Sequence, residues 1–159
     1  FREANAKGSD QRIGKTFKNV IKVGKGKSMQ FSQIQHCSVV VQNLERAAAF
    51  YREVLGLTEI EIPATFKLAG LNVRWFRLGE QQIHLVQGAA NPPGMLHHMA
   101  LQVDDAQAAR AWMNVKGFSV EETTPIPGAD RFFVRDPDDN LIEIIEWQQA
   151  YPNIPIAHN

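Results

Sequence analysis

Four side chains that can bind a metal ion occupy matched positions in two parts of the sequence. His36 and His98 each open an apolar run, 62 positions apart, while His84 and Glu143 lie within later runs, Ile-His-Leu and Ile-Glu-Ile. Neutral imidazole and carboxylate oxygen suit Zn, Ni, Fe(II) or Mn. Burying a glutamate in Leu-Ile-Glu-Ile-Ile is costly unless a cation compensates its charge. We therefore predict a divalent metal site at these four residues, with Glu143 also the candidate catalytic proton carrier.

Each of these residues also has a structural interpretation. A histidine at the start of a strand is often a hydrogen-bonded structural residue, and His84 could simply line a pocket. Glu143 could face outward, or pair with Arg74, Arg77 or Arg135. The metal prediction therefore depends on the four residues together, because they fill two pairs of equivalent positions.

The other candidate ligands fit less well. His97 and Cys37 adjoin His98 and His36, so in a strand their side chains point to the opposite face. We expect His97 to be structural or to contact a metal ligand without binding the metal, Cys37 to be a small core residue and His158 to be solvated.

An internal repeat explains the matched positions. The segments His36–Asn43 and His98–Asp105 each read as a strand that ends in a helix-capping residue. Apolar residues at helical spacing follow in both copies, and each predicted helix stops at a glycine, Gly56 or Gly117. Strands are then predicted in equivalent pairs, at 58–62 and 119–123, 73–78 and 131–135, and 83–86 and 141–145.

The repeat predicts an α+β fold of two tandem βαβββ modules, at about 31–87 and 95–147, within a folded body of residues 29–147. The modules would form a cupped mixed sheet with helices outside. A pseudo-twofold axis would bring the four candidate ligands to one concave face. Residues 88–94, rich in Gly and Pro, are the predicted linker, and residues 148–159 an irregular tail.

Composition excludes several classes of protein. The 17 basic and 17 acidic residues balance, so no overall charge favours nucleic acid or a membrane surface. No apolar run is long enough to span a bilayer, and a single cysteine excludes an intrachain disulfide framework, which favours a cytoplasmic location. Residues 1–28 carry eight basic and two acidic residues. We expect this segment to be disordered, a vector-derived or upstream extension, with a basic arm for an acidic partner as the alternative.

The chain resembles the vicinal oxygen chelate superfamily in four stretches, HCSVVVQNLERAAAFYREVLGL, QQIHLVQ, HHMALQVDD and RFFVRDPDDNLIEIIE. This superfamily contains glyoxalase I, extradiol dioxygenases, fosfomycin-resistance enzymes and bleomycin-resistance binding proteins. The resemblance implies paired βαβββ modules, often assembled as a homodimer with sites near the interface. It places the first, third and fourth metal positions on His36, His98 and Glu143. The second position, Glu in many glyoxalases, is His84 here, which puts lactoylglutathione lyase activity in doubt.

The leading functional hypothesis is a metal-dependent enzyme that acts on a small oxygenated molecule, with lyase or isomerase chemistry. The metal would chelate two adjacent oxygens and act as a Lewis acid. The candidate substrate-binding residues, which would line an apolar pocket and meet an anionic group, are Arg74, Trp75, Phe76, Arg131 and Phe133, with Phe132 a further aromatic candidate. The alternatives are an Fe(II) extradiol-type dioxygenase, a metal-free drug- or metabolite-binding protein, and an enzyme of thiol transfer to fosfomycin.

Overall fold

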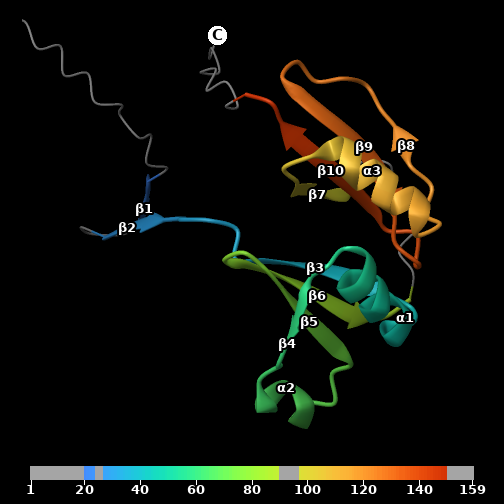
Figure 1. Cartoon of the computed structure of the whole chain (residues 1–159). Helices are drawn as coiled ribbons and strands as arrows, with labels where there is room; N and C mark the ends of the chain where they lie inside the picture. The colour runs from blue at the N-terminus through green and yellow to red at the C-terminus, as the bar shows by residue number, and fades with distance from the viewer. Residues whose placement is uncertain (1–19, 24–26, 90–96, 150–159) are drawn as a thin grey trace, which may run out of the picture. The chain divides into compact units, whose positions relative to one another are not determined.

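The computed structural model describes residues 20–23, 27–89 and 97–149 (Figure 1). The chain divides into two compact units, residues 1–33 and 34–159. In the first unit, β1 (Val20–Val23) pairs antiparallel with β2 (Lys27–Gln30), a hairpin that the sequence did not predict. Most of the predicted N-terminal extension, of the linker and of the C-terminal tail lies outside the described residues, as does His158.

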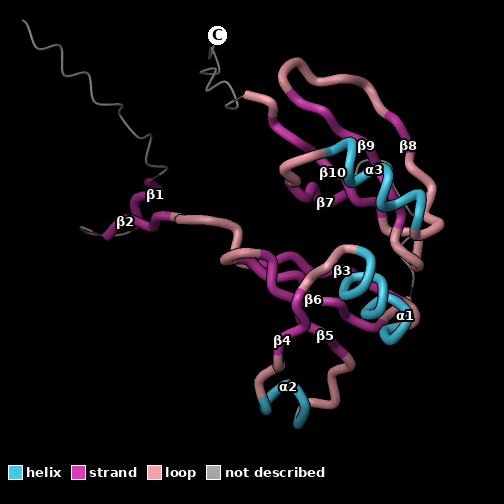
Figure 2. The backbone as a smooth tube through the Cα atoms, viewed as in Figure 1, coloured by secondary structure: helices cyan, strands magenta, loops and turns pink. Residues whose placement is uncertain are grey.

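The second unit contains both predicted modules, each with its own four-stranded mixed sheet (Figure 2). The first module comprises β3 (His36–Val41), α1 (Leu44–Ala49), the π-helical turn η1 (Phe50–Val54), β4 (Thr58–Ile60), α2 (Ala64–Leu68), β5 (Val73–Leu78) and β6 (Gln81–Gln87). The second comprises β7 (His98–Gln102), α3 (Ala106–Val115), β8 (Glu121–Glu122), β9 (Ala129–Arg135) and β10 (Leu141–Trp147). The strand orders β3-β6-β5-β4 and β7-β10-β9-β8 correspond, which confirms the predicted α+β fold of two βαβββ modules.

The helix boundaries follow the predicted capping residues. The Asn43 side chain accepts a hydrogen bond from the Arg46 amide at 3.0 Å, and Asp105 accepts one from the Ala108 amide at 2.8 Å. Gly56 and Gly117 adopt φ angles of 70° and 81°, a left-handed conformation that ends a helix at little cost for glycine. None of the described helices is long and apolar enough to cross a membrane.

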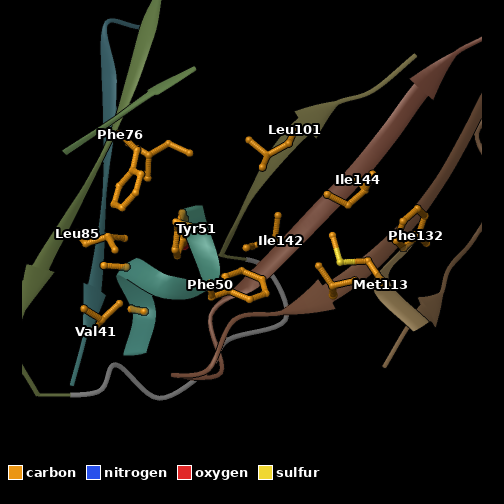
Figure 3. Close-up of a cluster of buried hydrophobic side chains, with 14 of the residues drawn as sticks. Val41, Phe50, Tyr51, Phe76, Leu85, Leu101, Met113, Phe132, Ile142 and Ile144 are labelled. Carbon is orange, nitrogen blue, oxygen red and sulfur yellow. The ribbon is translucent and has the colours of Figure 1, made fainter. Parts of the chain in front are cut away.

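Both modules contribute to one hydrophobic core (Figure 3). It contains Phe76 and Leu85 from one sheet, Phe132 and Ile142 from the other, and Tyr51 from the helical segment of the first module. The helices α1 and α3 and the turn η1 therefore pack on the core face of the sheets. Alternate side chains of each strand point to the opposite face.

The two copies meet at equivalent residues. The Cys37 sulfur lies 3.8 Å from the Met99 sulfur, and these residues are 62 positions apart, the offset of the repeat. Cys37 is half-buried against the core, as predicted, and burial raises the pKa of its thiol. The contact agrees with a pseudo-twofold relation between the modules.

The turn between β9 and β10, residues 136–140, ties the second module to the first. The Asn140 side-chain amide donates to the Val40 carbonyl at 3.0 Å and to the Asp136 carboxylate at 2.9 Å. The Asp138 carboxylate accepts from the Gln42 amide at 3.1 Å. Backbone groups at the end of β3 are therefore satisfied by side chains of the second module.

A buried pair strengthens this junction. The Tyr51 hydroxyl donates to the Asp136 carboxylate at 3.3 Å, and both residues are almost inaccessible to solvent. Burial raises the pKa of Asp136, and burial together with the Asp136 charge raises the pKa of Tyr51 well above its ordinary value.

Candidate metal centre

Strand register places the candidate ligands at corresponding positions of the two sheets. His84 of β6 pairs with Trp75 of β5, and Glu143 of β10 pairs with Phe133 of β9. His36 and His98 are the first residues of β3 and β7, which run parallel to β6 and β10. Because side chains alternate along a strand, the candidate ligand of each last strand lies on the face opposite the core. We call these faces the site faces.

In the second module, His98 and Glu143 lie close enough to share one ion. The His98 Nε2 atom and the Glu143 Oε2 atom form a hydrogen bond of 3.0 Å. Two ligands at a right angle, each about 2.1 Å from one metal ion, lie about 3.0 Å apart. The separation matches one edge of a coordination shell, and a bound ion would replace the hydrogen bond. We call the pair the C-terminal half-site.

Arg131 is the charged partner of Glu143. Its Nη1 atom donates to the Glu143 Oε1 atom at 2.8 Å, and only 8% of the Glu143 side chain is exposed. Both Nε and Nη2 of Arg131 donate to the Thr124 carbonyl, at 3.2 and 2.8 Å. One structural interpretation of the sequence was that Glu143 pairs with Arg74, Arg77 or Arg135. Glu143 does pair with an arginine, but that arginine is Arg131.

In the first module, His84 lies between two other rings. Its imidazole stacks on Trp75 with ring centroids 4.0 Å apart, and on His36 with centroids 4.3 Å apart. The His84 Nε2 atom is 2.8 Å from the Gln82 side-chain oxygen, and the His36 Nδ1 atom is 2.6 Å from that of Gln35. Burial, and the nearby His36, lower the pKa of His84, which favours the neutral form that a metal ligand needs.

The stacking limits what these two rings can do together. The His36 and His84 ring planes are 16° from parallel, so the lone pairs in those planes do not converge on one point. A shared ion requires one ring to rotate, whereas either ring alone can bind one through its second nitrogen. We call His36 and His84 the N-terminal half-site.

One chain holds the two half-sites separately. Within the part of the chain that the structure describes, no three His, Cys, Asp or Glu side chains form a group able to hold a metal ion. The core faces of both sheets share one cluster, and the half-sites lie on the opposite faces. His36 and His98 are both exposed, so each half-site is open to solvent or to another protein chain.

Alternation along the strands divides the predicted substrate-binding residues. Trp75, Arg131 and Phe133 lie on the site faces, and Phe133 also contacts His98, with ring centroids 5.2 Å apart. Phe76 is fully buried in the core, so it is unavailable to a substrate at these half-sites. Arg74 is on the same face of β5 as Phe76 and pairs with the carboxylates of Glu59 and Glu45.

Phe132 is likewise fully buried in the core, and His97 is exposed next to His98.

Sequence reasoning missed the side chains that orient the histidines. Gln82 lies two residues before His84 on β6, and Gln35 adjoins His36. Phe66 of α2 meets Trp75 edge-on with ring centroids 5.1 Å apart, which places this helix beside the site face. The i, i+2 spacing of Gln82 and His84 was a usable signal, whereas nothing in the repeat indicated Phe66, because α2 has no counterpart in the second module.

Comparisons with known proteins agree with the fold and the repeat. The chain is 34% identical over 123 residues to the uncharacterized protein YwbC of Bacillus subtilis, covering 72% of this chain and 97% of that protein. It is 30% identical over 97 residues to the mitochondrial methylmalonyl-CoA epimerase of Bos taurus, which covers 54% of this chain and 55% of the epimerase. A Bacillus anthracis structure described as a glyoxalase family protein superposes with a TM-score of 0.66 and 30% identity, covering 73% of this chain and 95% of that one. Residues 33–144 match the family model, and the chain therefore belongs to the Glyoxalase/Bleomycin resistance protein/Dioxygenase superfamily.

Proposed function

We propose that the protein is a metal-dependent enzyme that acts on a small oxygenated molecule by lyase or isomerase chemistry. The observation that carries this proposal is the pair of His98 Nε2 and Glu143 Oε2, 3.0 Å apart on the site face of the second module. The equivalent face of the first module supplies His36 and His84. A bound divalent ion would polarise a substrate carbonyl as a Lewis acid.

The protein side chains have separate roles in this proposal. His98, Glu143 and His36 would hold the ion, with His84 either a fourth ligand or a ring that orients His36. The Glu143 carboxylate accepts a proton from the carbon beside a substrate carbonyl and returns it, which is the proton transfer that such an isomerase or lyase requires. Trp75 and Phe133 provide apolar surface for the rest of the substrate. The epimerase named above is a relative of the isomerase class.

A second copy of the chain completes the site in this proposal. The half-sites lie on faces that turn away from their shared core, so one chain presents two incomplete sites. In a twofold dimer, the N-terminal half-site of one copy meets the C-terminal half-site of the other, and the symmetry produces two such sites. The exposure of His36 and His98 in the single chain supports this arrangement.

A metal-free binding protein is the second candidate, and one contact favours it. The Arg131 guanidinium already neutralises the buried Glu143 carboxylate at 2.8 Å, which is the role that a metal ion would otherwise have. In this alternative, the aromatic side chains of the site faces hold a small molecule without catalysis.

Metal binding by the full chain tests the proposal. Zn²⁺, Ni²⁺, Mn²⁺ and Fe²⁺ are titrated under anaerobic conditions, and bound metal is measured by mass spectrometry. We expect one ion per chain, with affinity reduced at least tenfold by His98→Ala and by Glu143→Gln. His97→Ala is the matched control, because His97 is exposed beside His98 and outside the half-site. A chain that binds none of these ions supports the metal-free alternative.

The proton transfer has its own assay. The metal-loaded protein is incubated with methylmalonyl-CoA in D₂O, and deuterium at the carbon beside the thioester carbonyl is measured by NMR. We expect exchange by the wild type and none by Glu143→Gln. Tight metal binding without exchange would restrict the proposal to another oxygenated substrate.

A further inference from the structure

The guanidinium of Arg131 is held in one orientation by the protein. It makes one hydrogen bond to the Glu143 Oε1 atom and two to the Thr124 carbonyl, from three different nitrogens. The side chain is 16% exposed, and its central carbon lies 5.8 Å from the centre of the Phe133 ring. These contacts fix the planar fork of the guanidinium, which in turn fixes the carboxylate it meets.

The two oxygens of Glu143 have different neighbours. Oε1 faces Arg131 at 2.8 Å, whereas Oε2 faces the His98 Nε2 atom at 3.0 Å. The Glu143 carboxylate therefore has one oxygen directed toward His98, its partner in the C-terminal half-site, and one directed toward the fixed guanidinium of Arg131. Such second contacts of a ligand commonly set its orientation and its affinity for metal.

Arg131 is found in the module that carries the Glu143 carboxylate, and the equivalent position of the other module has no arginine. Phe133 corresponds to Trp75, so Arg131, two residues earlier on β9, corresponds to Val73 of β5. Val73 is buried and apolar, and the residue equivalent to Glu143 is a histidine, His84. At this one position of the described strands, a cation therefore stands beside the acid of the second module, whereas the first module has an apolar side chain.

We propose that Arg131 is a positioning residue, which holds Glu143 Oε1 so that Oε2 alone is offered to the metal beside His98. This inference rests on the proposed function, because it concerns the same metal site. It assigns to Arg131 a protein carboxylate as partner, in place of the anionic group of a substrate. Without Arg131, both carboxylate oxygens are free to turn toward the ion.

Cobalt binding tests the role of Arg131 without any substrate. Co²⁺ is titrated into the full-length wild type and into Arg131→Met, Arg131→Lys and Arg135→Met, and the visible absorption spectrum of the bound ion is recorded. The spectrum depends on the number and geometry of the ligands, so a purely structural role would leave it unchanged. Arg135 is the matched control, because it lies on the same face of β9 but pairs with Glu121 and Asp139.

We expect Arg131→Met to raise the Co²⁺ dissociation constant about 10- to 100-fold and to change the spectrum. Arg131→Lys recovers part of the affinity, since it keeps the charge but lacks the fork. Arg135→Met keeps the wild-type values. Wild-type affinity and spectrum in Arg131→Met, or tighter binding, overturn the inference.

Two further outcomes separate this inference from the proposed function. Loss of Co²⁺ binding in Glu143→Gln together with wild-type binding in Arg131→Met overturns the role of Arg131 alone. Failure of the wild type to bind Co²⁺ overturns both. If circular dichroism shows Arg131→Met to be unfolded, Arg131→Lys decides, because a wild-type spectrum in that variant contradicts a need for the fork.

Discussion

A metal site shared between two copies of the chain predicts that two inactive variants restore each other. His36→Ala damages the N-terminal half-site, and Glu143→Gln damages the C-terminal half-site. In a dimer that contains one copy of each variant, one site combines the two intact half-sites and the other combines the two damaged ones. The hybrid should therefore bind about half as much metal as the wild-type dimer, and each parent much less.

The hybrid is obtained by expressing the two variants together with different affinity tags and purifying over both. Its metal content is compared with those of the wild type and of each parent at the same ion concentration. The control hybrid combines His36→Ala with His84→Ala, where both lesions lie in the same half-site. That hybrid tests whether His84 is a ligand, because restored binding there means that His84 is dispensable.

A His36→Ala and Glu143→Gln hybrid that binds no more metal than its parents would refute the shared site. The two half-sites would then have to meet within one chain, or not at all. A chain that stays monomeric by light scattering at the concentrations of the metal titration, yet binds one ion, would also refute it. The separation of the half-sites within the described residues is the reason that neither result is expected.

Three further predictions concern the stability of the second unit, measured by urea unfolding. Tyr51→Phe removes the hydrogen bond to Asp136 and should lower the unfolding free energy by about 0.5–1.5 kcal/mol; no change would mean that the 3.3 Å contact contributes nothing. Burial raises the pKa of Asp136 above 3.8, so the folded state binds this proton more readily, and the unfolding free energy should fall as pH rises from 3.8 through the folded-state pKa. Subtracting the curve for Asp136→Asn isolates this effect, and a difference that rises with pH over that range contradicts it. Phe132→Ala should cost about 3–5 kcal/mol because its ring is fully buried, whereas Phe133→Ala on the half-exposed site face should cost less; equal losses would contradict the assignment of faces.

The repeat made the arrangement of strands predictable from the sequence. Because both copies carry a capping residue and a terminal glycine at the same offset, the helix boundaries at Asn43, Gly56, Asp105 and Gly117 could be read directly. The equivalence of His84 and Glu143 followed from the same alignment and agrees with the observed register. Elements without a copy, namely α2 and the β1–β2 hairpin, were missed for the same reason.

The side chains around the site were harder to predict. Consecutive aromatic residues such as Trp75 and Phe76 place one apolar ring on each face of a strand. The alternation of side chains alone therefore did not show which of the two rings lies in the core. Arg131 and Glu143 are diagonal neighbours on the antiparallel strands β9 and β10, because Glu143 lies opposite Phe133, two residues after Arg131. Such a contact is determined by the register of the two strands. The separation of the half-sites depends on how the modules pack, which the pattern within each module does not encode.

The 136–140 turn also has a consequence for biosynthesis. At the end of β3, the Gln42 amide donates to Asp138, which lies 96 positions further along the chain. The Val40 carbonyl accepts from Asn140, which lies 100 positions further along. When the N-terminal module leaves the ribosome, these groups and the apolar face of its sheet have nothing from the second module to cover them. We therefore expect the nascent chain to remain susceptible to proteases and chaperones until residue 140 has emerged, even though each half of the sequence encodes a complete supersecondary unit.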